Sequence, residues 1–135
     1  MKTIKIFAII TIAIIAFAFV GIQQKKPAAW NIPAEFKNME NPLANDKASI
    51  NKGKMIYMKH CRSCHGNTGM GDGPKAARLK TFPGDFSCTE FHKFTDGELL
   101  YITVKGRDEM PSYQNKIPNK KDRWAVVNYM RALKK

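Results

Sequence analysis

The sequence contains few cysteines and few acidic residues. Its 135 residues include three cysteines, Cys61, Cys64 and Cys88, and an odd number argues against a framework of paired disulfides. Three thiolates are also too few for a four-cysteine zinc site, although histidines could complete one. Acidic residues number 11 against 23 lysines and arginines, which gives a formal net charge of +12 at pH 7. A positive charge of this size favours anionic partners, such as an acidic protein face or an anionic lipid surface.

Strand patterns and internal repeats are also missing. No stretch alternates apolar and polar residues convincingly, which argues against a sheet and against βαβ units. The lysines and arginines are spread along the chain rather than gathered in one run or stripe, so nucleic acid is not an expected partner. A chain of this length is expected to form one domain with a small hydrophobic core.

The chain begins with a basic and then apolar segment. Lys2 and Lys5 precede 17 uncharged residues, Ile6 to Ile22, a pattern typical of an export signal. Ala-Phe-Ala at 16–18 fits a cleavage site, whereas 17 apolar residues nearly span a bilayer. A signal peptide and an uncleaved membrane anchor therefore both remain open for residues 1–22. In either case we expect the remainder outside the cytoplasm, on the periplasmic side of the membrane.

Residues 23–48 contain three prolines and few apolar runs. We interpret this segment as a tether that holds the following domain, residues 49–135, away from the membrane. Trp30 and Phe36 complicate the interpretation. Each of these aromatic side chains would either pack on the domain or dock on a partner protein.

Three segments of the domain have helical patterns. The predicted helices run from Ser49 to about His60, from Thr95 to Gly106 and from Asn119 to about Leu133, with Ser49 and Asn119 as the N-caps of the first and the last. Thr95 and Glu98 form a capping box at the start of the second helix. A glycine inside a helix costs about 1 kcal/mol relative to alanine, so Gly53 predicts a close crossing with another helix. The sequence therefore predicts an all-α domain of three main helices joined by long loops.

Residues 61–65 read Cys-Arg-Ser-Cys-His and carry the most specific chemistry in the chain. Cys61 and Cys64 are three residues apart, so at a helix end they can point the same way. Both thiols can then bond the two vinyl groups of one haem, while the imidazole of His65 reaches the iron. This is the attachment pattern of haem c, and it predicts one covalently bound haem.

Two other uses of this motif have less support. A thioredoxin-like redox pair requires a βαβ context, which the sequence lacks. A zinc site could combine the motif with Cys88, His60 or His92, but a second pair of closely spaced ligands is missing. We interpret Cys88 as a buried inert thiol, with a dimer-forming disulfide or an additional cofactor contact as alternatives.

Residues outside the CRSCH motif also fit a haem-binding domain. Gly53 and Tyr57 lie eight and four residues before Cys61, and the last predicted helix carries an apolar stripe that includes Met130. With these features, the chain from Ser49 to Leu133 resembles the class I c-type cytochromes. The resemblance implies a small cytochrome c fold wrapped around one haem, in which the first helix crosses the last near Gly53 and Tyr57.

The same resemblance implies the sixth iron ligand, a methionine in a late loop that is commonly followed by proline. Met110 in "KGRDEMPSY" has this context, and elimination independently favours it because the other candidate methionines lie in the tether, near the motif or in the core stripe. His65 and Met110 are therefore the expected iron ligands. By similarity, the carbonyl of Pro74 would accept a hydrogen bond from His65 and orient its imidazole.

Together these features predict a monohaem c-type cytochrome that carries single electrons between membrane or periplasmic redox complexes. A thioether ligand raises the reduction potential, and two axial ligands leave no open iron site, so we expect no catalysis and no small-molecule substrate. The basic surface would dock on an acidic face of a redox protein or respiratory complex. A fixed subunit of one respiratory complex remains an alternative, as does a haem enzyme or gas sensor with a displaceable sixth ligand. Candidate contacts for the haem propionates are Arg78, Lys80 and Arg107.

Overall fold

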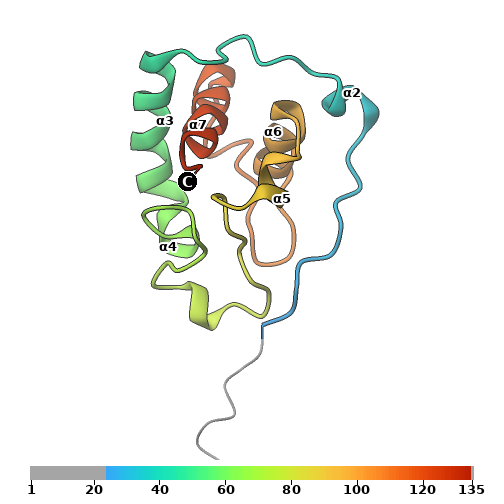
Figure 1. Cartoon of the computed structure of the whole chain (residues 1–135), viewed down its shortest axis with the longest axis vertical. Helices are drawn as coiled ribbons and strands as arrows, with labels where there is room; N and C mark the ends of the chain where they lie inside the picture. The colour runs from blue at the N-terminus through green and yellow to red at the C-terminus, as the bar shows by residue number, and fades with distance from the viewer. Residues whose placement is uncertain (1–23, 135) are drawn as a thin grey trace, which may run out of the picture.

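The long helices of the domain lie where their capping and apolar patterns predict them (Figure 1). The structure is a computed structural model that describes residues 24–134, so the apolar segment at 1–22 lies outside the described residues. The described helices are α2 (Ala34–Lys37), α3 (Lys47–His60), α4 (Arg62–His65), α5 (Thr89–His92), α6 (Asp96–Lys105) and α7 (Lys120–Ala132), with a 3₁₀ turn at Ala76–Arg78. Residues 24–134 contain no strand, which confirms the all-α prediction for this part of the chain. No helix within it is long and apolar enough to cross a membrane.

Capping accounts for the boundaries of α6 and α7. Thr95 Oγ1 accepts a hydrogen bond from the backbone of Glu98 at 3.2 Å, and the Glu98 carboxylate accepts one from the Thr95 backbone at 2.7 Å. This reciprocal pair confirms the predicted capping box. Gly106 ends α6 in the left-handed region, at φ +62°. The Asn119 side chain caps α7 as predicted.

The start of α3 differs from the prediction. Asp46, not Ser49, caps this helix, because its carboxylate accepts a hydrogen bond from the backbone of Ala48 at 2.9 Å. Ser49 is buried in the first turn, where its hydroxyl accepts a hydrogen bond from Asn128 of α7 at 2.9 Å. A serine is a favourable N-cap when a helix is considered alone. Here the Ser49 hydroxyl is buried instead, because it is hydrogen-bonded to Asn128 of α7.

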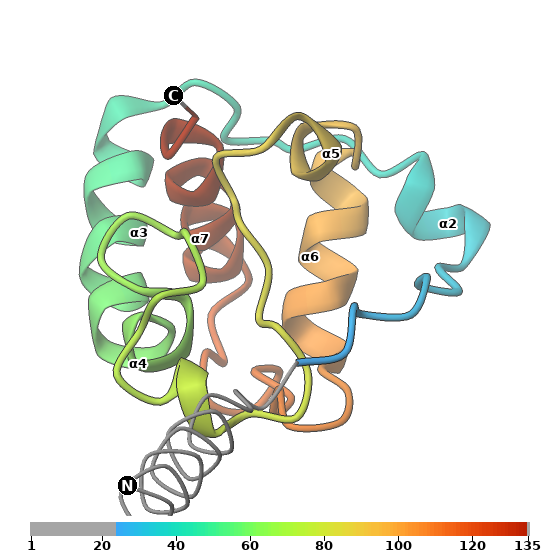
Figure 2. The same ribbon diagram turned by 60° about the horizontal axis from the view of Figure 1, so that its bottom comes forward.

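Helices α3 and α7 cross closely and lie side by side in both views (Figures 1 and 2). A Cβ added to Gly53 would lie 1.8 Å from the carbonyl oxygen of Ala125, so only glycine allows this approach. One turn later the Tyr57 and Tyr129 rings pack with their centroids 5.1 Å apart. The predicted crossing of the first and last helices is therefore confirmed.

The segment before α3 packs on the domain instead of standing off from it. Residues 24–37, called the strap below, run along the side of α6 that faces away from α7 (Figure 1). Ile32 is buried, and the ring of Phe36 lies 4.9 Å from the ring of Tyr101 on α6. The Trp30 ring also contacts Tyr101, at 6.4 Å. Of the two fates considered for Trp30 and Phe36, packing on the domain is therefore the one observed. The role of residues 23–48 as a tether to the membrane stays a prediction.

Candidate functional site

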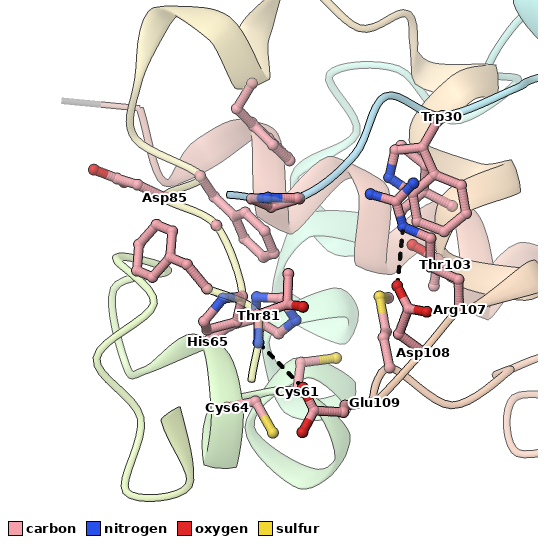
Figure 3. Close-up of a pocket in the computed structure, with 18 of the residues that line it drawn as sticks. Trp30, Cys61, Cys64, His65, Thr81, Asp85, Thr103, Arg107, Asp108 and Glu109 are labelled. Carbon is pink, nitrogen blue, oxygen red and sulfur yellow. Dashed lines mark hydrogen bonds and ion pairs between the residues drawn. The ribbon is translucent and has the colours of Figure 1, made fainter. Parts of the chain in front are cut away.

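A cavity of about 480 Å³ opens between the CRSCH segment, the loop at 79–86, α6 and the loop after α6. Its volume lies within the range of small-molecule and cofactor pockets, about 300–1,000 Å³. Cys61, Cys64 and His65 line one side of the cavity, and Met110 lines it from the loop after α6. Figure 3 shows the three motif residues on one side and Arg107 and Asp108 opposite. The fold thus brings four of the five predicted site residues to one cavity, and Pro74 does not line it.

The two cysteines of the motif reach the cavity from the junction of α3 and α4. Cys61 ends α3, where its N–H donates to the carbonyl of Tyr57 at 2.8 Å, and Cys64 follows on α4. Burial, with a smaller contribution from Cys64, raises the pKa of Cys61 to about 12. Zinc binding requires thiolates, and no cluster of three or more metal-binding side chains occurs within residues 24–134. Two cysteine side chains in the wall of one apolar cavity suit covalent attachment to an organic group.

The His65 side chain is only 8% exposed, and it packs against Phe86 with 4.5 Å between ring centroids. Burial lowers its pKa to about 4, so the imidazole is neutral at pH 7 and has a free lone pair for a metal. Its buried Nδ1 has no hydrogen-bond partner among the described residues. A buried ring nitrogen without a hydrogen bond destabilises the folded protein, which indicates that a further group belongs next to His65. A neutral histidine beside two cysteines in an apolar cavity fits a haem iron.

The predicted hydrogen bond between His65 and Pro74 is not formed in this structure, because Nδ1 makes none. The loop around Pro74 is nevertheless held against α4 on both sides. Gly73 N–H donates to the Cys64 carbonyl at 3.2 Å, and Lys75 N–H donates to the Ser63 carbonyl at 2.8 Å. The role of Pro74 stays a prediction.

Met110 is half-buried and lies in a tight turn. Its N–H donates to the carbonyl of Arg107 at 2.8 Å, and Asp108 between them has a left-handed φ of +50°. Met130 of α7, which the sequence assigned to the core stripe, also lines the cavity and is 6% exposed. Two thioethers therefore reach the cavity, one from a surface turn and one from the core, while Met55 is 62% exposed outside it.

Comparison with known proteins identifies the family. Residues 48–130 match the family model described as cytochrome c oxidase, cbb3-type, subunit III. The match spans more than half of the chain. The chain belongs to this family of cytochrome c domains. No curated protein matches.

Two solved structures have the same fold. The c-type cytochrome KustC0563 aligns with a TM-score of 0.51 and 24% identity, over 62% of this chain and 98% of its own. A structure of the reducing HAO-like protein complex Kustc0457/Kustc0458 from Kuenenia stuttgartiensis aligns with a TM-score of 0.60 and 24% identity. That alignment covers 89% of this chain and 54% of the other, so this chain spans about half its length.

Family membership establishes the cofactor. A cytochrome c domain carries covalently bound haem c with its iron and transfers electrons. The haem predicted from the CRSCH motif is confirmed, and the interpretations of the motif as a zinc site or a redox disulfide are wrong. The cavity that this motif lines is called the haem pocket below.

Sequence reasoning missed much of the haem pocket wall. Four phenylalanines line it, Phe82, Phe86, Phe91 and Phe94, and their clustering in "FPGDFSCTEFHKF" was a usable signal. Strap residues 26–30 also line it, and no local pattern indicates that. Cys88 is half-buried and contributes to the wall, which differs from the buried thiol that we predicted and favours a contact with the cofactor.

Charges of both signs line the haem pocket. The lining includes two cations, Lys26 and Arg107, and four carboxylates, Asp85, Glu90, Asp108 and Glu109. Of the three basic residues considered for the propionates, Arg107 is the one that lines the pocket. Most of the chain's excess of basic residues therefore lies away from the pocket lining.

Proposed function

We propose that this c-type cytochrome is a single-haem electron carrier whose iron is held by His65 and Met110. The observation that supports this most is the placement of the CRSCH residues and Met110 around one largely apolar cavity. When bound, the haem supplies a one-electron couple between ferric and ferrous iron. With the His65 nitrogen and the Met110 thioether as its ligands, the iron would have no open site for a substrate. We therefore propose electron transfer without catalysis at the iron.

The protein's own residues have three tasks in this proposal. The two cysteines hold the cofactor covalently, and His65 offers a neutral imidazole because burial keeps it unprotonated. The phenylalanine-rich wall excludes water, which favours the less charged reduced state and raises the potential. Met110 adds a soft ligand that favours ferrous iron.

Replacement of the two pocket methionines tests the axial assignment. The oxidised wild type should show the weak far-red charge-transfer band of a methionine-to-iron bond. Met110→Ala should lose this band. Met130→Leu, which conserves the volume of a buried side chain, should keep it. Survival of the band in Met110→Ala would exclude Met110 as the ligand.

Carbon monoxide distinguishes this proposal from a haem enzyme or gas sensor. Reduced wild-type protein with an intact methionine bond should bind carbon monoxide poorly at neutral pH, whereas Met110→Ala should bind it readily. Ready binding by the wild type would instead favour an enzyme or sensor with a displaceable sixth ligand.

We further propose an exported protein on the periplasmic side of the membrane, either anchored through residues 1–22 or released by cleavage. The basic n-region and the apolar run support export. The net charge of +12 supports docking on an acidic face of a redox protein or respiratory complex. The intact mass of the mature protein would report cleavage and haem attachment together.

The salt dependence of electron transfer tests the proposed docking. The bimolecular rate with an acidic redox protein should fall about tenfold or more from low salt to near 1 M, because screening removes the steering. A rate that is independent of salt would contradict electrostatic docking.

A fixed subunit of a respiratory complex is the second candidate. The family description, which names a subunit of an oxidase, favours it. Purification in mild detergent would distinguish the two roles. A fixed subunit would co-purify with its complex in constant proportion and would resist a high-salt wash, whereas a mobile carrier would be washed away.

A further inference from the structure

Three segments that are distant in sequence join across one side of the haem pocket. They are the beginning of the strap, at 24–30, the loop at 79–82 and the turn at 106–110 that carries Met110. Figure 2 shows the strap meeting the loop before α5 at the lower end of the domain. The three segments together are called the clasp below, and each contributes residues to the pocket lining.

Arg107 joins the Met110 turn to the strap. Its guanidinium donates hydrogen bonds to the carbonyls of Ala28 at 2.5 Å and Ala29 at 3.1 Å. The same group stacks over the ring of Trp30, with 4.0 Å from Cζ to the centroid. The side chain is 25% exposed. Two charge-assisted hydrogen bonds and a cation–π contact thus hold one planar group in place.

Glu109 joins the other flank of the turn to the loop. Its Oε2 accepts hydrogen bonds from the backbone N–H of Lys80 at 2.8 Å and of Thr81 at 3.2 Å, the second of which is drawn in Figure 3. Arg107 and Glu109 are the third residue before Met110 and the residue directly before it. The contacts of Arg107 and Glu109 therefore hold the turn in place next to the Met110 thioether.

The strap and the loop complete the clasp by bonding to each other. Lys25 N–H donates to the carbonyl of Lys80 at 3.0 Å, and Phe82 N–H donates to the carbonyl of Lys25 at 3.1 Å. The Gln24 side chain donates to the carbonyls of Ala76 and Leu79 at 2.6 and 2.9 Å. The Met110 turn cannot swing outward without breaking contacts to both neighbours.

We infer that Arg107 and Glu109 are positioning residues that keep Met110 on the iron by fastening its turn to the strap and to the loop at 80–81. This inference rests on the proposed ligation by Met110. The strap lies before residue 48, where the family match begins. The clasp therefore includes a segment of this chain that lies outside the residues matched by the family model. A ligand carried on a half-buried surface turn leaves the iron when the turn opens, and the clasp opposes that opening.

Imidazole binding to the oxidised full-length holoprotein measures this opening. Imidazole takes the sixth site only after Met110 leaves, so its apparent affinity scales with the population of the open turn. Arg107→Ala should bind imidazole about tenfold more tightly or better, and its far-red band should disappear at a lower imidazole concentration. Glu109→Leu should shift in the same direction, whereas Glu109→Gln, which keeps an acceptor oxygen, should shift less.

Two further variants distinguish the hydrogen bonds of Arg107 from its positive charge. Lys105→Ala removes an exposed cation two residues away and should leave imidazole affinity unchanged. Arg107→Lys keeps the charge but loses the planar fork, and it should resemble Arg107→Ala. If Arg107→Lys or Arg107→Ala behaves as the wild type while the wild-type band is present, the clasp inference is overturned and ligation by Met110 stands.

A Met110→Ala background completes the test. With no thioether to displace, Arg107→Ala should have no effect on imidazole affinity there. An equal effect in both backgrounds would mean that Arg107 acts on the pocket in general, which overturns the inference. A wild type without the far-red band would overturn the axial proposal and this inference with it.

Discussion

Gly53 shows most clearly how a single residue determines the packing of this domain. The carbonyl of Ala125 occupies the space that a side chain at position 53 would need. Next to the crossing, the hydroxyl of Tyr57 donates to the carbonyl of Gly66 at 2.8 Å. Gly66 directly follows His65, so the same crossing that packs the core also supports the residue after the proposed iron ligand.

Replacement of Gly53 by alanine should separate α3 from α7. The new Cβ would meet a backbone atom at 1.8 Å, and backbone cannot rotate away as a side chain can. We expect a loss of about 3 kcal/mol in the free energy of unfolding, at the upper end for overpacking. Guanidinium unfolding of the holoprotein measures it.

The control for this prediction is Asn51→Ala, an exposed position on the same helix. Its stability should change by no more than about 0.5 kcal/mol. If Gly53→Ala were as stable as this control, the close crossing would not be a constraint.

At the scale of elements, a buried polar network positions α7 against the chain before α3. Asn128 is 5% exposed, and its amide donates to the carbonyl of Leu43 at 2.5 Å and to the hydroxyl of Ser49 at 2.9 Å. Its side-chain oxygen accepts from Asn41 at 2.6 Å, and Asn41 also donates to Asp96 at 2.7 Å. One side chain thus links α7 to the start of α3 and, through Asn41, to the start of α6.

Asn128→Ala should weaken these three connections together. Buried polar groups left without partners cost about 1–3 kcal/mol each, so we expect a loss of roughly 3 kcal/mol in unfolding free energy. Thermal or guanidinium unfolding checks this, with the exposed Asn115→Ala as the control. A loss no larger than that of the control would show that water replaces the network without cost.

At the scale of the whole molecule, the haem pocket is large for so small a domain. A cavity of about 480 Å³, lined largely by apolar side chains, lies where α6, α7 and the loops between them would otherwise pack on one another. The total stability of a small domain is only about 5–15 kcal/mol, so the loss of packing across such a space is a large fraction of it. The helices around this space therefore depend on the cofactor for their packing.

Loss of the haem should unfold the domain. A full-length Cys61→Ala/Cys64→Ala variant, freed of residual haem, should lose most of its far-UV circular dichroism and show no cooperative thermal transition. The wild-type holoprotein is the reference, and intact mass confirms the presence or absence of the cofactor. A haem-free variant that kept native helix content and a cooperative transition would contradict this.

The sequence predicted the parts of the fold that follow local rules. Helix caps form as predicted at Thr95, Glu98 and Asn119, and Gly53 lies at the predicted helix crossing. The Ser49 cap was wrong because a buried partner on α7 competes for that hydroxyl. The course of the strap along α6 could not be predicted from its prolines, which suggest only extension, because the contacts of its aromatic residues depend on where α6 lies.

The sequence by itself predicted the cofactor, because the CRSCH motif supplies two thiols and an imidazole within a few residues and its surroundings resemble those of a c-type cytochrome. The tertiary structure decided which residues close around it. The bonds from Arg107 to Ala28 and Ala29 join positions 79 and 78 residues apart. No short-range pattern of hydrophobicity or capping encodes such a pair, since both groups are ordinary surface residues until the chain folds.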